Sequence, residues 1–226
     1  MSAQSKQAKL HATAKVRASV AIILGIMLAL AGLPPSAHAA PKDSMVAVTT
    51  LAGLNADDSV SWSQLGGDAT MLAANFHAQS VGALSTTGSL AAAGSLVSVI
   101  CPAAQCSWGS AGNGGFSAGD FVLWTSDTAN GGTGPLKLTF KNSVKGVGAL
   151  IQADGPAQFT AQIQAFNGKK LLKGFTAVSD ADGDAVFLGA LDQTAAHITS
   201  VTYSVTKCTG ACTDFAIDTL FINSGG

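Results

Sequence analysis

Alternation of apolar and polar side chains marks residues 159–165 as a β-strand. Their sequence is Phe-Thr-Ala-Gln-Ile-Gln-Ala, in which every second residue is apolar. A period of two places the apolar set on one face of a sheet and the polar set on the other, as a half-buried strand requires. Asn167 and Gly168 follow and favour the positive φ angles of a two-residue hairpin turn, so residues 169–178 are predicted to return as the partner strand.

Similar strand patterns recur along the chain, and from Pro135 onward turn residues separate them at intervals typical of a sandwich or barrel. No repeat with a period of 20 to 50 residues is present, which argues against a solenoid or propeller. We therefore expect an all-β fold. The remaining predicted strands are residues 60–65, 120–124, 136–140, 185–191, 197–206 and 213–222.

Residues 66–100 allow two interpretations. Asp68 could cap a short helix that runs through Met71 and Phe76. The spacing of Gly and Ser after these residues suits short strands better, and we predict strands there. Residues 110–119 are so rich in glycine that we predict a loop.

The first forty residues have the composition of a cleaved signal peptide. An apolar run at residues 18–33 is only 16 residues long, shorter than the roughly 20 needed to span a bilayer, and it ends at Pro34. Small residues at Ala37 and Ala39 suit signal peptidase, which predicts a signal peptide over residues 1–39. The run is preceded by basic residues without acidic ones, namely Lys6, Lys9, Lys15 and Arg17.

Residues 40–226 are predicted to form one secreted domain, either extracellular or periplasmic. No twin arginine precedes the apolar run, so export by the general secretory route is expected, and after cleavage the protein is not embedded in the membrane. This part has eight lysines and thirteen aspartates, hence a net charge of −5, and neither Arg nor Glu. Nucleic-acid recognition relies on arginine forks and basic patches, so a nucleic-acid partner is excluded.

Four cysteines remain after cleavage, and an exported protein meets an oxidising compartment in which such a set usually pairs. Three connectivities are open. Cys101 with Cys106 and Cys208 with Cys212 are favoured, because each pair brackets a short stretch that can turn between neighbouring strands.

Several segments of the chain together carry a resemblance to a known family. They are Ser61-Trp62-Ser63-Gln64-Leu65-Gly66, Gly119-Asp120-Phe121-Val122-Leu123-Trp124-Thr125, Gly146-Val147-Gly148-Ala149-Leu150-Ile151-Gln152-Ala153-Asp154, Phe159-Thr160-Ala161, Phe187-Leu188-Gly189 and Asp214-Phe215-Ala216-Ile217-Asp218. These segments resemble a domain of exported bacterial proteins sorted by an exosortase, the PEP-CTERM proteins. The resemblance covers most of residues 58–222 and implies a jelly-roll-like antiparallel β-sandwich similar to carbohydrate-binding modules, without an established chemistry.

The chain departs from that family because it ends at Gly226 without the sorting tail, so release rather than anchoring is expected. The leading hypothesis is a secreted, non-catalytic β-sandwich that binds extracellular glycan or another surface polymer. A structural matrix protein without a specific small ligand is an alternative.

A secreted serine hydrolase is the rival hypothesis from another class. Residues 115–119, Gly-Phe-Ser-Ala-Gly, match the nucleophile elbow of α/β-hydrolases, with Ser117 as nucleophile. Asp192 (or Asp184) and then His197 follow in the chain order of a triad. The elbow needs a strand before the serine and a helix after it, whereas glycines precede Ser117 and a predicted strand follows, so a loop is the favoured interpretation.

Calcium is the candidate cofactor. Asp180, Asp182 and Asp184 alternate around a glycine turn, where carboxylates can converge on one hard cation. Ala185 and Leu191 occupy the positions of the invariant glycine and bidentate glutamate of an EF-hand loop, so an acidic hairpin turn is the competing interpretation. Weaker candidates for a calcium between the first and last strands are Asp57, Asp58, Asp214 and Asp218.

Tryptophan is the candidate platform for sugar rings, whose apolar faces suit aromatic side chains. Trp62 and Trp124 lie inside apolar strand patterns and are predicted to be core residues. Trp108 lies just before the glycine-rich loop and is predicted to be exposed and to bind the ligand.

Overall fold

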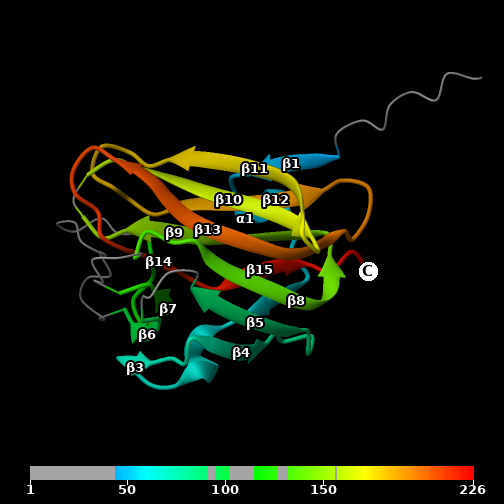
Figure 1. Cartoon of the computed structure of the whole chain (residues 1–226), viewed down its shortest axis with the longest axis horizontal. Helices are drawn as coiled ribbons and strands as arrows, with labels where there is room; N and C mark the ends of the chain where they lie inside the picture. The colour runs from blue at the N-terminus through cyan, green and yellow to red at the C-terminus, as the bar shows by residue number, and fades with distance from the viewer. Residues whose placement is uncertain (1–43, 91–94, 102–114, 127–131, 156) are drawn as a thin grey trace, which may run out of the picture. The chain divides into compact units, whose positions relative to one another are not determined.

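Two antiparallel β-sheets face each other across a shared core (Figure 1). The computed structural model describes residues 44–90, 95–101, 115–126, 132–155 and 157–226, which belong to one compact unit. All strand pairs within these residues are antiparallel. This arrangement confirms the prediction of a single all-β antiparallel sandwich.

The front layer in Figure 1 is a six-stranded sheet with the strand order β11-β10-β13-β8-β5-β4. Its central strands are long because the alternation of buried and partly exposed residues persists through them. The six strands are β4 (Asn75–Gln79), β5 (Ser85–Leu90), β8 (Leu136–Val144), β10 (Phe159–Asn167), β11 (Lys170–Val178) and β13 (Ile198–Cys208).

The second layer is a nine-stranded sheet with the order β1-β12-β9-β14-β7-β6-β3, and β15 joins β9 to β2. The two short strands β14 and β15 therefore lie along the same side of β9. The nine strands are β1 (Met45–Val48), β2 (Asp58–Val60), β3 (Thr70–Met71), β6 (Val97–Ile100), β7 (Phe121–Trp124), β9 (Gly146–Ala153), β12 (Val186–Asp192), β14 (Phe215–Ile217) and β15 (Leu220–Asn223).

One predicted strand is split in two. Residues 213–222 were expected to be continuous, but pairing shifts from Ile217 opposite Ile151 to Phe221 opposite Gly148. Four steps along one strand thus match three along the other, which is the geometry of a β-bulge. The bulge lets β14 pair with β7 while β15 pairs with β2.

The core lies between the facing sides of the two sheets. From β10 it takes Phe159, Ala161 and Ile163, which are at most 1% exposed. Their polar neighbours Gln162 and Gln164 point to the other side and are partly exposed. The alternation in the sequence therefore assigns the two faces of β10 as predicted.

The two outer faces differ. On the six-stranded sheet, Gln164, Thr202, Lys137, Ser89 and Asn75 stand opposite one another on neighbouring strands and form a polar row. On the nine-stranded sheet, part of the outer face is covered by a second apolar cluster built on Cys101, Phe116, Val122 and Ala216. Phe116 lies in the loop that precedes β7, so this loop shields the strands beneath it from solvent.

The prediction of a strand over residues 60–65 is wrong beyond Val60. Trp62–Leu65 form a 3-10 helix, which Ser61 caps by accepting a hydrogen bond from the amide of Ser63. Trp62 is nonetheless fully buried, and its indole donates a 2.9 Å hydrogen bond to the carbonyl of Asp218. The tertiary bond to the last strands fixes this turn.

The strands expected within residues 66–100 are confirmed as β3, β4, β5 and β6, and Asp68 caps no helix there. Its carboxylate instead accepts a 2.9 Å hydrogen bond from the amide of Ile100. The sequence patterns did not predict β1, β9 or the short helix α1 (Leu51–Leu54). The predicted signal peptide, residues 1–39, lies outside the described residues.

Candidate functional site

A pocket of about 500 Å³ opens at one end of the nine-stranded sheet. Helix α1, strands β2 and β15 and the turn between β4 and β5 contribute its walls. The lining includes the apolar side chains of Leu51, Val81 and Phe221. It also includes the polar side chains of Asn55, Asp57 and Asp58. A concave site of mixed lining is the usual form of a small-ligand site.

Helix α1 gives the pocket one rim. Thr50 begins the helix, and its hydroxyl accepts a 3.1 Å hydrogen bond from the amide of Gly53. Asn55 ends it with a φ of 50°, in the left-handed region that Asn tolerates better than most residues. This one-turn element leaves Leu51 43% exposed beside the pocket.

Asp58 joins the pocket floor to the turn between β4 and β5. One carboxylate oxygen accepts 2.8 Å hydrogen bonds from the amides of Ser59 and Gly82, and the other accepts one from the hydroxyl of Ser80. The amide of Val81 also bonds the carbonyl of Ser59 at 2.9 Å. These bonds hold Val81, which is 87% exposed, at the pocket mouth.

Asp57 ties the same segment to the end of β15. Its two carboxylate oxygens accept hydrogen bonds of 2.7 Å from the amide and the hydroxyl of Ser224. The Ser224 hydroxyl, followed by its backbone amide, lowers the pKa of Asp57. The carboxylate is therefore anionic at neutral pH, and the pocket presents fixed negative charge.

A second pocket of about 410 Å³ lies on the other side of the two aspartates. Asp57 and Asp58 line both pockets, and Asn142 and Ser143 add polar groups to the second. The two hollows are therefore adjacent.

Phe221 forms an aromatic part of the first pocket. It packs against Phe187 with ring centroids 6.4 Å apart and planes tilted by 43°. Gly148 lies beneath, where an added Cβ would come within 2.7 Å of the Phe187 ring. The glycine therefore leaves room for the aromatic pair that positions Phe221.

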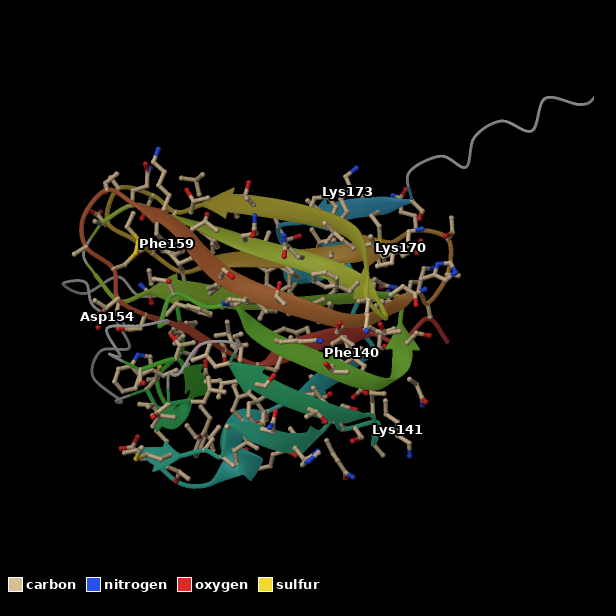
Figure 2. The ribbon with its side chains drawn as sticks, in the orientation of Figure 1. Phe140, Lys141, Asp154, Phe159, Lys170 and Lys173 are labelled. Carbon is tan, nitrogen blue, oxygen red and sulfur yellow. A yellow bond between two sulfur atoms is a disulfide. The ribbon has the colours of Figure 1, made fainter. Side chains whose placement is uncertain are left out.

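Positive charge is concentrated elsewhere. Within the described residues, every lysine lies on the six-stranded sheet or on a turn that leaves it. Figure 2 labels three of them, Lys141 on β8 and Lys170 and Lys173 on β11. None of the residues that line the first pocket is a lysine.

The structure brings together only two members of the predicted triad. The Nδ1 atom of His197 lies 2.7 Å from a carboxylate oxygen of Asp192, and the other oxygen accepts bonds from the amide and hydroxyl of Thr194. Burial opposes ionisation of Asp192, but the bonds from Thr194, His197 and Ser44 prevail and lower its pKa. The side chain of His197 is exposed.

Ser117 lies far from that pair. Gly115 abuts Ala185 at the beginning of β12, where an added Cβ would come within 2.5 Å of the Ala185 side chain. Asp192 is at the other end of β12, seven residues away, or about 23 Å at 3.3 Å per residue. Ser117 is only two residues from Gly115, so the chain between them can shorten the distance to Asp192 by about 7 Å at most. The amide of Ser117 bonds Asp120 at 2.9 Å.

The aspartates of the predicted calcium loop form a hairpin turn. Asp180 accepts a 2.9 Å hydrogen bond from the amide of Asp184, and Asp180 and Asp182 are exposed. Among the described residues, no three or more His, Cys, Asp or Glu side chains are arranged to hold a metal ion. One oxygen of Asp184 is shielded from solvent and has no hydrogen-bond partner.

Asp214 and Asp218, the weaker calcium candidates, are engaged in bonds of their own. Asp214 is fully buried and accepts bonds of 2.7 Å from the indole of Trp124 and 2.8 Å from the hydroxyl of Thr213. Asp218 accepts a 2.5 Å bond from the amide of Thr219, and burial raises its pKa. The bonds between Asp57 and Ser224 instead join the segment before β2 to the end of β15.

The predicted pairing of Cys208 with Cys212 is confirmed, with their Cα atoms 6.2 Å apart. Cys101 is also disulfide-bonded and is 1% exposed, whereas its predicted partner Cys106 lies outside the described residues. The predicted ligand-binding Trp108 lies outside them as well.

Sequence patterns identified only part of this pocket. Asp57 and Asp58 had been noted as a pair of carboxylates, but Leu51, Val81 and Phe221 are brought to them from distant segments. The Asn at position 55 is a local signal for the end of a helix, and it was overlooked because the helix is one turn long.

Comparison with known proteins finds no matching family model, no matching curated protein and no matching solved structure. The fold therefore defines the class, an antiparallel β-sandwich with a mixed polar and apolar pocket at one end. In the part of the chain that the structure describes, no helix has the length and apolar character needed to cross a membrane.

Proposed function

We propose that the protein is a secreted binding protein for a neutral extracellular glycan and that a sugar unit occupies the pocket beside Asp57, Asp58 and Phe221. The observation that carries this proposal is the pairing, in one open hollow, of an aromatic and aliphatic wall with fixed acceptor groups. The Cys208–Cys212 disulfide is in keeping with an oxidising location outside the cytoplasm.

A sugar ring has one face of C–H groups and a rim of hydroxyls. The side chains of Leu51, Val81 and Phe221 offer a surface on which the C–H face can be buried. Carboxylate and amide oxygens at Asp58 and Asn55 offer acceptors for the hydroxyl rim. Hydrogen bonds to an ionised acceptor are stronger than neutral ones, which favours orientation of a hydroxyl-bearing ligand.

The charge of the pocket selects against acidic sugars. Asp57 and Asp58 line both subsites, and the lining of the first contains no cationic side chain. A uronic acid or phosphate would meet the negative charge of Asp57 and Asp58 at short range. A neutral glycan has no such penalty, and two adjacent subsites suit a chain of more than one sugar unit.

Binding without turnover is proposed because the residues of the hydrolase alternative are dispersed. Ser117 is two residues from Gly115, which abuts Ala185 just before β12, whereas Asp192 and its partner His197 lie at the other end of that strand. Nucleophile and base must come within hydrogen-bond reach for the serine mechanism. Replacing Ser117 with Ala is expected to leave any hydrolysis by the purified protein unchanged.

The proposal is tested by screening the mature protein on a glycan array and titrating the best neutral oligosaccharide by calorimetry. Three variants address the pocket: Phe221→Leu removes the ring, Val81→Ser removes an apolar contact, and Asn55→Gly removes the amide but preserves the left-handed backbone. Each is expected to weaken binding about tenfold, the equivalent of roughly 1.4 kcal/mol.

Val178→Ser is the matched control for Val81→Ser, because Val178 is 58% exposed on β11, away from the pocket. Its affinity should equal that of the wild type. The proposal fails if no neutral glycan binds, or if Val178→Ser weakens binding as much as the three pocket variants do.

A further inference from the structure

Gln152 is a fully buried polar residue whose hydrogen bonding is incomplete. It lies on β9, is 0% exposed, and its Nε2 donates a 2.9 Å hydrogen bond to the carbonyl of Gly183. Its Oε1 has no hydrogen-bond partner among the residues that the structure describes. A buried amide oxygen without a partner costs about 1–3 kcal/mol, so an unbonded state is unfavourable.

A second shielded oxygen belongs to the next residue of the same turn. Oδ1 of Asp184 is out of contact with solvent and has no partner, and Asp184 directly follows the Gly183 that bonds Gln152. The carboxyl group of Asp180 is close enough to Asp184 to share a hydrogen bond with it. Gly183, whose carbonyl Gln152 bonds, thus lies in the same turn as Asp180 and Asp184.

These oxygens cannot satisfy one another, because ionised carboxylates and amide oxygens are acceptors only. Burial, and then the charge of Asp180, raises the pKa of Asp184, which shows that the arrangement is unfavourable for the ionised carboxylate. A hydrogen-bond donor or a cation placed between the oxygens removes both the repulsion and the missing bonds.

We propose that a calcium ion binds at this turn, with Oδ1 of Asp184, Oε1 of Gln152 and the carboxylate of Asp180 as its protein ligands. Calcium takes six to eight oxygen ligands, including amide oxygens and waters, in a flexible geometry. Magnesium demands a near-ideal octahedron and retains its waters, so it suits these ligands less well. Asp180 shares a hydrogen bond with Asp184 and Asp182 does not, so Asp182 lies outside the proposed ligand set.

Gln152 is the residue that distinguishes this site from the loop expected from the sequence. The sequence pattern grouped Asp182 with Asp180 and Asp184 as alternate carboxylates. In the structure, the third ligand instead comes from β9, 28 residues earlier than Asp180. A calcium ion here would tie the β11–β12 turn to the middle of the nine-stranded sheet, away from the glycan pocket.

Thermal unfolding of the mature protein in 1 mM calcium and in chelator tests the proposal. At a dissociation constant near ~10⁻⁴ M, calcium should raise the melting temperature by roughly 3–5 °C, and magnesium should raise it less. Asp184→Asn should abolish the response. Asp180→Asn, which keeps an acceptor for the amide of Asp184, should reduce it, and calorimetry on the folded variants should show the same order.

Asp182→Asn is the matched control from the same turn and should retain the full response to calcium. The proposal is overturned if the wild type melts at the same temperature in calcium and in chelator, or if Asp182→Asn loses the response as Asp184→Asn does. A third result also overturns it: calcium has no effect, stability falls with rising pH in the wild type, and this pH dependence is absent in Asp184→Asn. In that case a proton on Asp184, and not a calcium ion, relieves the repulsion.

Discussion

Aspartate is the only acidic residue in the chain, and the structure uses it largely to bond backbone amides. Asp57, Asp58 and Asp68 each accept a hydrogen bond from an amide that lies far along the chain. A short carboxylate side chain reaches neighbouring backbone donors more readily than glutamate does. Clusters of aspartate that resemble metal loops in the sequence are therefore, in part, anchors for turns.

Asp192 gives a residue-scale prediction. Asp192→Asn should lower the free energy of unfolding at pH 7 by about 2 kcal/mol, because the carboxylate that serves both Thr194 and His197 is lost. The pKa of Asp192 is lowered by folding, so its contribution is fully present above the usual carboxyl pKa of ~3.9 and is lost as the pH falls below it. Urea unfolding at pH 7 and at pH 2.5 measures both effects.

Asp182→Asn serves as the control, since Asp182 is exposed, and it should change stability by less than about 0.5 kcal/mol at either pH. If Asp192→Asn is as stable as the wild type at pH 7, the bonds to Thr194 and His197 contribute nothing and the interpretation of Asp192 is wrong.

At the scale of elements, alternation predicted the long strands well and the short ones poorly. Strand β10 could be predicted because it has one polar and one apolar face along almost its whole length, and β11 because the Asn167-Gly168 turn leads back from β10. Strand β9 is covered on both faces, so its sequence lacks that alternation, and it includes two glycines that leave room for neighbouring side chains. The 3-10 turn at Trp62 depends on the hydrogen bond from its indole to the distant Asp218, so no local sequence pattern could predict it.

Two glycines in strands provide a prediction at this scale. Gly88 on β5 faces the ring of Phe76, and an added Cβ would come within 2.0 Å of it. Gly88→Ala should therefore cost about 1–3 kcal/mol of stability through overpacking, because Phe76 is buried with its ring 6.2 Å from that of Trp62. Denaturant unfolding measures the loss.

Gly174→Ala on β11 is the matched control. The nearest atom to its added Cβ is 3.5 Å away, an ordinary contact, so this variant should be neutral or slightly stabilising. Equal effects of the two substitutions would contradict the packing described between β4 and β5.

At the scale of the whole molecule, charge is divided between the two sheets. The described lysines belong to the six-stranded sheet and its turns, whereas Asp57 and Asp58 mark the end of the nine-stranded sheet. Of the candidate site, only the carboxylates of Asp57 and Asp58 could be predicted from the sequence. Leu51, Val81 and Phe221 are far apart in the chain and are brought together only by the fold. Residues 40–226 contain no arginine, so their composition argues against an arginine-based anion site.

The proposed export concerns the whole chain and gives a prediction of its own. The secreted protein should begin at or within one residue of Ala40, because the small residues before it suit signal peptidase. Intact-mass analysis of protein collected from the producing cells settles the point. A mass that includes Met1 to Ala39 would contradict export by this route.

Hydrogen exchange with and without a saturating neutral oligosaccharide tests the proposed glycan pocket most directly. Binding at the pocket predicts slower exchange in residues 51–59, in the turn at residues 80–84 and at the end of β15, which contains the Phe221 wall. The polar outer row of the six-stranded sheet should exchange at an unchanged rate. Slower exchange confined to β10, β13 and β8 would place the glycan on that row and contradict the proposed site.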